Sequence, residues 1–318
     1  MSVPSLKLGL IGLGNMGQNH LRVLSLLKGV EIAFVHDADR SRQARLAAMY
    51  GVPGVDDVDA AMAGLDAAVI ATPTSTHAQW VERAARHVRN IFVEKPLAGT
   101  LAEAERLAAF AGERGLCIQV GFIERFNPAV QVLERVLAKS ARVISVDFTR
   151  TNKLSARITD VDVITDLMIH DIDLAMFING PVKSVSAHGA GEGSMIDFAS
   201  ALLTHESGCF SRIQASRVTE KKMRTIQATC RDMFVDCDLL RKEVQISRQS
   251  EVRLSEGEPY VISALAESVE VRPQEALLSE LQAFVAHSRG EPQQIPDHVA
   301  GLEAMRICER IQDMVHSA

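Results

Sequence analysis

The stretch Gly12-Leu13-Gly14-Asn15-Met16-Gly17 follows the short apolar run Leu6–Ile11 and opens a segment in which leucines recur at helical spacing. In a strand–turn–helix unit, the first glycine permits a tight turn and the second lets the backbone approach a pyrophosphate. The third allows the helix to pack closely on the strand. Because the helix N-terminus offers unpaired N–H groups to phosphates, the motif predicts a dinucleotide site. We expect it to be lined by Gly12, Gly14, Asn15, Met16 and Gly17.

An acidic residue, Asp37, ends the next apolar run, Glu31–His36, and stands 20 positions beyond the last glycine. A carboxylate at this place accepts hydrogen bonds from both ribose hydroxyls and repels a 2′-phosphate. Asp37 therefore favours NAD as the cofactor. Arg40 can stack on adenine or pair with a 2′-phosphate, so that NADP stays open as an alternative.

Apolar runs alternate with amphipathic segments over the first 120 residues. This alternation predicts a parallel sheet covered by helices on both faces, and right-handed crossovers then give a doubly wound Rossmann fold. The expected strands are Leu6–Ile11, Glu31–His36, Ala67–Ala71, Ile91–Val93 and Leu116–Val120. The expected helices are Met16–Leu27, Ser41–Tyr50, Ala78–His87 and Leu101–Ala111.

The pattern changes near residue 121, because the period of the apolar residues drops toward two after two further helical segments. A hairpin is expected between Phe198–His205 and Cys209–Arg217. Two closing helices, 273–288 and 298–315, can pack back on the first domain. At 318 residues the chain suits about two domains. We expect a Rossmann domain over residues 1–121 and an α+β domain over 122–318, with a large, mostly antiparallel, open-faced sheet.

Composition excludes several classes of function. Lys and Arg number 34 against 40 Asp and Glu, which leaves no positive excess to neutralise nucleic acid. The five cysteines have no Cys-x-x-Cys spacing, so that neither a disulfide framework nor a zinc site is expected and a cytoplasmic location is favoured. No apolar run is long enough to cross a membrane. The expected partner is therefore a small molecule.

Two other dehydrogenase classes are excluded by their catalytic residues. Short-chain enzymes need a Tyr-x-x-x-Lys motif, but Tyr50 is followed by Gly54 and Tyr260 by Ala264 at the lysine position. Zinc alcohol dehydrogenases need a Cys/His ligand set, which the scattered cysteines do not provide.

Two polar motifs follow buried strands at the sheet edge where doubly wound folds bind ligands. Residues 71–77, Ala-Thr-Pro-Thr-Ser-Thr-His, can lie against the dinucleotide, or can form an ordinary loop in which Thr74 or Ser75 caps a helix. Lys95, in Glu94-Lys95-Pro96, can relay a proton if a cationic nicotinamide lowers its pKa, or can be a surface lysine.

Asp166, His170 and Asp173 share one face of a predicted helix, since they stand four and seven positions apart. Three interpretations remain open. The imidazole can relay a proton while Asp166 orients it, the group can bind a metal together with Asp160 and Asp162, or the face can be solvated and carry ion pairs.

The four motifs together, in this order, resemble the Gfo/Idh/MocA (glucose–fructose oxidoreductase/inositol dehydrogenase) family over essentially the whole chain. The resemblance implies that Lys95 and His170 act in catalysis, that Asp166 assists the histidine, and that no metal is needed. It implies NAD(P)-dependent oxidation of a CH–OH group and a homodimer or homotetramer. It also assigns to the cofactor site Ala71, Thr72, Pro73, Thr76, His77, Glu94 and Lys95.

Residues 121–128, Gly-Phe-Ile-Glu-Arg-Phe-Asn-Pro, look like the branch of the family that oxidises nucleotide sugars, as UDP-N-acetylglucosamine 3-dehydrogenases do. We therefore expect NAD-dependent oxidation of a sugar hydroxyl to a ketone. An inositol or free-sugar dehydrogenase, an NADPH-dependent carbonyl reductase and a non-catalytic dinucleotide-binding regulator are the alternatives. The residues expected at the substrate are Arg125, Asn127, Lys153, Arg157 and Asp173. Oligomer formation is expected from an exposed apolar sheet face at Phe198, Ala199, Ala201 and Leu202.

Overall fold

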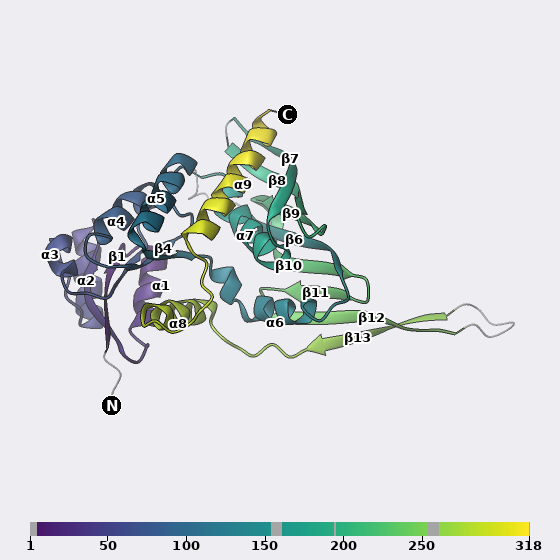
Figure 1. Cartoon of the computed structure of the whole chain (residues 1–318), viewed down its shortest axis with the longest axis horizontal. Helices are drawn as coiled ribbons and strands as arrows, with labels where there is room; N and C mark the ends of the chain where they lie inside the picture. The colour runs from purple at the N-terminus through teal and green to yellow at the C-terminus, as the bar shows by residue number, and fades with distance from the viewer. Residues whose placement is uncertain (1–4, 154–160, 194, 254–260, 318) are drawn as a thin grey trace. The chain divides into compact units, whose positions relative to one another are not determined.

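The computed structural model describes residues 5–153, 161–193, 195–253 and 261–317. The chain divides into two compact units (Figure 1). Unit 1 consists of residues 1–123 and 276–306, and unit 2 of residues 124–275 and 307–318. The first segment of unit 1 therefore ends two residues beyond the expected boundary. Unit 1 also includes a later segment with the first closing helix and part of the second.

Unit 1 is built on a five-stranded sheet in the order β2-β1-β3-β4-β5. Every neighbouring pair is parallel, so that all five strands end at one edge of the sheet. The strands are β1 Leu6–Ile11, β2 Val30–His36, β3 Ala67–Ile70, β4 Asn90–Glu94 and β5 Cys117–Gly121. Their bounds follow the predicted runs, because continuous apolar stretches suit strands that are buried on both faces.

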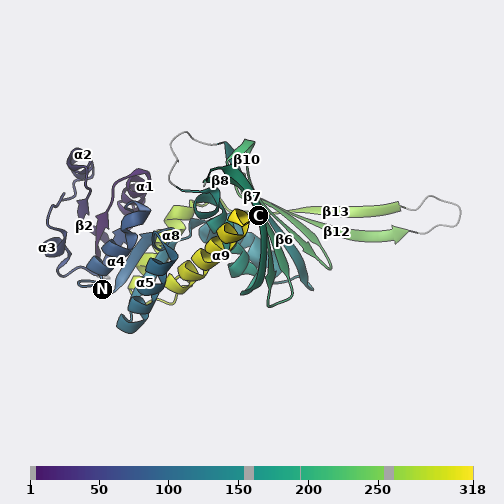
Figure 2. The same ribbon diagram turned by 90° about the horizontal axis from the view of Figure 1, so that it is seen from above.

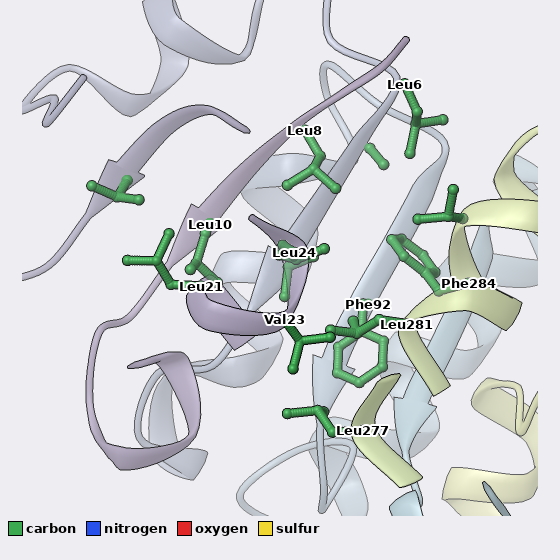
Figure 3. Packing of buried hydrophobic residues seen from close by; sticks show 14 of the residues in the cluster. Leu6, Leu8, Leu10, Leu21, Val23, Leu24, Phe92, Leu277, Leu281 and Phe284 are labelled. Atoms are coloured by element: carbon green, nitrogen blue, oxygen red, sulfur yellow. The ribbon is translucent and has the colours of Figure 1, made fainter. Parts of the chain in front are cut away.

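The helices of unit 1 cover this sheet and complete its core. They are α1 Asn15–Leu24, α2 Arg40–Tyr50, α3 Val58–Met62, α4 His77–Ala84, α5 Leu101–Arg114, α8 Ala276–Ser288 and the first part of α9 His298–His316. Figure 3 shows Leu277, Leu281 and Phe284 of α8 beside Phe92 of β4 and Val23 of α1. The rings of Phe92 and Phe284 meet edge to face, 5.7 Å apart. A segment far along the chain therefore supplies part of the core of the first unit.

Unit 2 contains an eight-stranded sheet in the order β13-β12-β11-β10-β6-β9-β8-β7. Only the β6–β9 pair is parallel among these described strands. The strands are β6 Val143–Lys153, β7 Val182–Glu192, β8 Met195–His205, β9 Phe210–Ser216, β10 Val218–Cys230, β11 Phe234–Asp238, β12 Glu243–Arg253 and β13 Val261–Val269. The two sheets confirm the predicted fold class and the expected β8–β9 hairpin.

The last hairpin, β12–β13, reaches beyond the rest of its sheet (Figures 1 and 2). β11 pairs with β12 only over residues 243–247, whereas β13 pairs with β12 as far as Arg253. The outer half of the hairpin therefore forms a two-stranded ribbon. No helix that the structure describes is long and apolar enough to span a membrane.

Helices α6 Pro128–Leu137 and α7 Ile169–Asn179 contact strands of this sheet, α6 at β11 and β12 and α7 at β6 and β9. Side chains alternate along β8, where Ala199 and Ala201 are buried, Phe198 is half-buried and Leu202 is exposed. The expectation that these four residues form one exposed apolar face is therefore wrong, because neighbouring residues of a strand point to opposite faces.

Candidate active site

The glycine loop of unit 1 connects β1 to α1, and its three glycines meet different surroundings. A Cβ at Gly12, which has a φ of +90°, would collide with the backbone of Ala71 and Thr72. A Cβ at Gly17 would collide with the carbonyl oxygen of Gly12. At Gly14 a Cβ would meet no atom within 4 Å. Gly14 therefore keeps open a space that a ligand can fill, as the motif predicts.

The N-terminus of α1 supports the same interpretation. Its N-cap is Gly14, which has no side chain to accept from the first N–H groups. Side chains cap α2, α3, α5 and α6, whereas α4 and α7, like α1, have no side-chain cap. The first turn of α1 also has no acidic residue. The helix therefore presents donors and the positive end of its dipole to an anion.

Asp37 is buried at the end of β2, beside the glycine loop. Its Oδ2 accepts from the Leu13 N–H at 2.6 Å, and its Oδ1 accepts from the Asp39 N–H at 2.7 Å. Nη1 of Arg42 also lies 3.5 Å from Oδ2. Because each carboxylate oxygen has about two acceptor positions, Oδ1 can still accept from a ribose hydroxyl. Asp37 thus holds the loop in place and keeps part of the capacity that the sequence predicts for it.

The arginine beside the ribose position differs from the expected one. Arg40 is 72% exposed and pairs with Asp56, outside the cavity lining. Arg42 lines the cavity instead, and its Nη2 lies 3.2 Å from Oδ2 of Asp39. The side chain of Asp39 caps α2, and the Ser41 hydroxyl and the Arg42 N–H hold its pKa below the usual value. Arg42 therefore lines the cavity, and the expected Arg40 does not.

These elements enclose a cavity of about 550 Å³ at the carboxyl edge of the parallel sheet. Its volume is within the usual range for small-molecule sites. It is lined by Gly12, Gly14, Asn15, Met16, His36, Asp37, Ala38, Asp39, Arg42, Ala71, Thr72, Pro73, Thr76 and Trp80. The lining therefore fits the adenosine and phosphates of a dinucleotide.

His77 ties the 71–77 loop to the strand end after β4. Its Nδ1 lies 2.7 Å from the Pro96 carbonyl oxygen, and its Nε2 lies 3.0 Å from the Thr72 carbonyl oxygen. Burial lowers the pKa of His77 below its usual value of 6.5. His77 therefore connects the 71–77 loop to the segment after β4, while Thr72, Pro73 and Thr76 line the cavity.

The Glu94-Lys95-Pro96 motif ends β4. Glu94 is buried, and its Oε1 lies 2.6 Å from Nε2 of His20 on α1. Glu94 thus connects the helix that carries the glycine loop to the strand that carries Lys95, and it does not line the cavity. Lys95 is half-buried, and the Lys95–Pro96 peptide is cis.

In unit 2, a π-helical turn, Ile164–Met168, leads directly into α7 and replaces the start of the regular helix that the sequence predicts. Such turns occur frequently at functional sites. Asp166 lies in the π-turn and His170 in the first turn of α7, both partly exposed. Arg217 donates from Nη2 to Oδ2 of Asp166 at 3.2 Å. This arginine stands 51 positions from Asp166 and belongs to none of the motifs in the sequence.

Asp173 lies on α7 but forms a buried ion pair. Arg125 donates to it from Nε at 2.8 Å and from Nη2 at 2.5 Å, and the guanidinium of Arg125 also covers the ring of Phe177. Burial raises the pKa of Asp173, against the attraction of Arg125. The two side chains that we expected at the substrate are thus bonded to each other.

A second buried ion network joins α7 to the strand β6 and to the 121–128 motif. Arg150 donates from Nε and Nη2 to Asp171 at 2.8 Å each, and from Nη1 to Glu124 at 2.9 Å. Burial opposes ionisation of Glu124, but the charge of Arg150 outweighs it and holds the pKa of Glu124 below the usual value. Arg224 adds a contact to Glu124 at 3.4 Å.

The other residues that we expected at the substrate either form hydrogen bonds and ion pairs within the protein or lie outside the described residues. The amide of Asn127 caps α6 and donates to Glu124 and to the carbonyl oxygen of Leu239. Lys153 is exposed and pairs with Glu220. Arg157 and Asp160 lie outside the described residues. Within the described ranges, no group of three or more His, Cys, Asp or Glu could hold a metal ion.

Comparison with known proteins covers both units. Residues 6–122 match the model described as an oxidoreductase family with an NAD-binding Rossmann fold, and residues 142–233 match the GFO/IDH/MocA C-terminal domain. UDP-N-acetylglucosamine 3-dehydrogenase from Acidithiobacillus ferrooxidans is 29% identical over 98% of each chain. Its structure gives a TM-score of 0.88 over 99% of each chain.

A second relative is inositol 2-dehydrogenase from Rhizobium meliloti, which is 28% identical over 96% of this chain and 95% of its own. The family matches together include the glycine loop and the strands β6 to β10 of unit 2. From its two domains and its NAD-binding loop, the chain belongs to the Gfo/Idh/MocA family of NAD-binding oxidoreductases.

Proposed function

We propose that this protein oxidises a secondary hydroxyl of a nucleotide sugar to a ketone, with C3 of UDP-N-acetylglucosamine as the leading substrate position. The observation that carries the proposal is the similarity to UDP-N-acetylglucosamine 3-dehydrogenase over 98% of both chains. A shared fold alone does not determine a substrate. The proposal therefore depends equally on the residues that this chain presents for the chemistry.

Lys95 and His170 are the two candidate proton acceptors, and Asp166 is the carboxylate that orients the imidazole. NAD, when bound, supplies the acceptor for the hydride that leaves the substrate carbon. One of the two bases removes the hydroxyl proton in the same step, which makes the carbon–hydrogen bond a hydride donor. The NAD would be held by the glycine loop, Asp37 and the N-terminus of α1.

Arg224 is the arginine of unit 2 that we assign to the substrate, in place of Arg125. Its side chain is about a third exposed, and Asp166 acts on it electrostatically. Burial and the charge of Arg150 lower the pKa of Arg224. A guanidinium binds a phosphate or carboxylate with directed hydrogen bonds, which suits the diphosphate of a nucleotide sugar.

An inositol or free-sugar dehydrogenase is the second candidate, because the inositol 2-dehydrogenase relative also matches nearly the whole chain. The test is NADH formation with NAD and, in parallel, UDP-N-acetylglucosamine, free N-acetylglucosamine and myo-inositol. The proposal expects the UDP sugar to give the highest kcat/KM. Turnover of myo-inositol alone would replace the proposal with the second candidate.

Lys95→Met separates an enzyme from a dinucleotide-binding regulator. We expect this variant to bind NAD and to form no NADH. Lys7→Met is the matched control, because Lys7 is an exposed lysine of the same sheet, paired with Glu31 at 3.6 Å. Tight binding of NAD by the wild type without turnover of any of the three compounds would favour the regulator.

A further inference from the structure

Arg217 is a buried arginine between β9 and β10, with 3% of its side chain exposed. Its backbone N–H donates to the carbonyl oxygen of Asp197 at 2.8 Å, which fixes its place in the sheet. Both of its side-chain hydrogen bonds to described residues come from one nitrogen of the guanidinium. Nη2 donates to the carbonyl oxygen of Asp162 at 3.0 Å and to Oδ2 of Asp166 at 3.2 Å.

The other two nitrogens of this guanidinium, Nε and Nη1, are buried and have no hydrogen-bond partner among the residues that the structure describes. Arg150, in the same unit, instead donates from all three of its nitrogens to carboxylates. A buried charge that replaces only part of its hydration destabilises the fold. Arg217 is therefore poorly explained as a stabilising residue.

The π-turn next to Arg217 is held together by bonds that do not include it. Asp162 accepts from the Thr165 N–H at 2.8 Å, and its other oxygen accepts from Nε2 of Gln312 at 2.7 Å. The Asp166 N–H donates to the Asp162 carbonyl oxygen at 3.0 Å. Loss of the Arg217 guanidinium would therefore leave the backbone of the turn bonded.

We propose that Arg217 is a positioning residue that fixes the carboxylate of Asp166 for the reaction, at a cost in stability. A guanidinium at hydrogen-bond distance restricts the rotation of a carboxylate through a directed hydrogen bond. The inference rests on the proposed function, in which Asp166 orients His170. Unsatisfied buried groups of this kind are expected where function, and not packing, selects the residue.

The test compares Arg217→Met, Arg217→Lys and Arg212→Met by kinetics and by thermal unfolding. Arg212 is the matched control, since it is an arginine of the adjoining strand β9 that also pairs with an aspartate, Asp147, but is exposed. In Arg217→Met we expect kcat to fall about 10-fold or more, because the variant loses part of the rate enhancement that acid–base catalysis supplies. The KM for NAD should stay unchanged. Arg217→Lys should recover part of kcat, because it restores a positive charge.

Stability distinguishes a positioning role from a structural one. The proposal expects Arg217→Met to unfold at the wild-type temperature or above it, and Arg212→Met to keep the wild-type kcat. A fall of several degrees in Arg217→Met, or an unchanged kcat, would overturn the proposal. If the wild type oxidises none of the sugars tested, the proposed function fails, and the unfolding temperature of Arg217→Met still decides whether Arg217 destabilises the fold.

Discussion

Arg150→Met tests the buried network that anchors α7, and its cost can be worked from the contacts. Arg150 is 2% exposed and is bonded to two carboxylates that are themselves buried. Without the guanidinium, Glu124 keeps Arg224, but Asp171 loses both of its Arg150 bonds. A buried carboxyl of ordinary pKa near 4 must then be protonated at pH 7, which costs about 4 kcal/mol. This value agrees with the cost of about 3–5 kcal/mol that follows the removal of one partner from buried ion pairs in other proteins.

The assay is urea unfolding of the wild type, Arg150→Met and the double variant Arg150→Met/Asp171→Asn at pH 7 and pH 5. We expect the single variant to lose about 4 kcal/mol at pH 7, a large fraction of a typical total stability. The loss should shrink at pH 5, where protonation of Asp171 is cheaper, and the double variant should recover part of it. Arg212→Met, an exposed pair, should lose at most about 1 kcal/mol. A loss below about 1 kcal/mol in Arg150→Met would contradict this prediction.

Three further predictions concern the cofactor unit. Gly14→Val should weaken NAD binding in a fluorescence titration without lowering the unfolding temperature, because a Cβ at Gly14 meets no atom within 4 Å. Gly17→Val should instead unfold the unit, because a Cβ at Gly17 collides with the backbone of Gly12. Arg42→Ala should change the ratio of NAD to NADP affinity and Arg40→Ala should not, since only Arg42 lines the cavity; equal effects would contradict that assignment. The lowered pKa of His77 means that the unfolded chain takes up a proton before the folded chain does. The contribution of His77 to stability is therefore full above pH 6.5 and is lost as the pH falls through the pKa of the folded state. In urea titrations, the difference in unfolding free energy between the wild type and His77→Gln should shrink as the pH falls from 6.5 to that pKa.

Local patterns were sufficient to predict the five strands of unit 1 and the glycine loop, but not the contribution of α8 to the core. Each glycine acts within a few residues of itself or on the neighbouring strand end, and the buried strands are continuous apolar runs. Asp37 was predicted for the same reason, because its position is determined by the strand that it ends. Spacing alone indicated Arg40, whereas the first turn of α2 directs Arg42 to the cavity and Arg40 to Asp56.

The ion pairs of unit 2 depend on contacts between distant segments, which spacing along the chain does not reveal. Arg125 and Asp173 are separated by 48 positions, and Arg217 and Asp166 by 51. One local signal was present, however. Val146, Phe148 and Arg150 alternate along β6 and are all buried, so that period two places an arginine on the apolar face of the strand. Such an arginine needs buried carboxylates, and α7 carries two.

The most direct test of the proposed reaction uses UDP-N-acetylglucosamine with deuterium at C3 of the sugar ring, incubated with the wild-type protein and NAD. Mass spectrometry of the nicotinamide cofactor then reports where the hydride came from. We expect NADH that carries one deuterium and a ketone at C3 of the sugar. Unlabelled NADH, or recovery of the labelled sugar without any NADH, would contradict it.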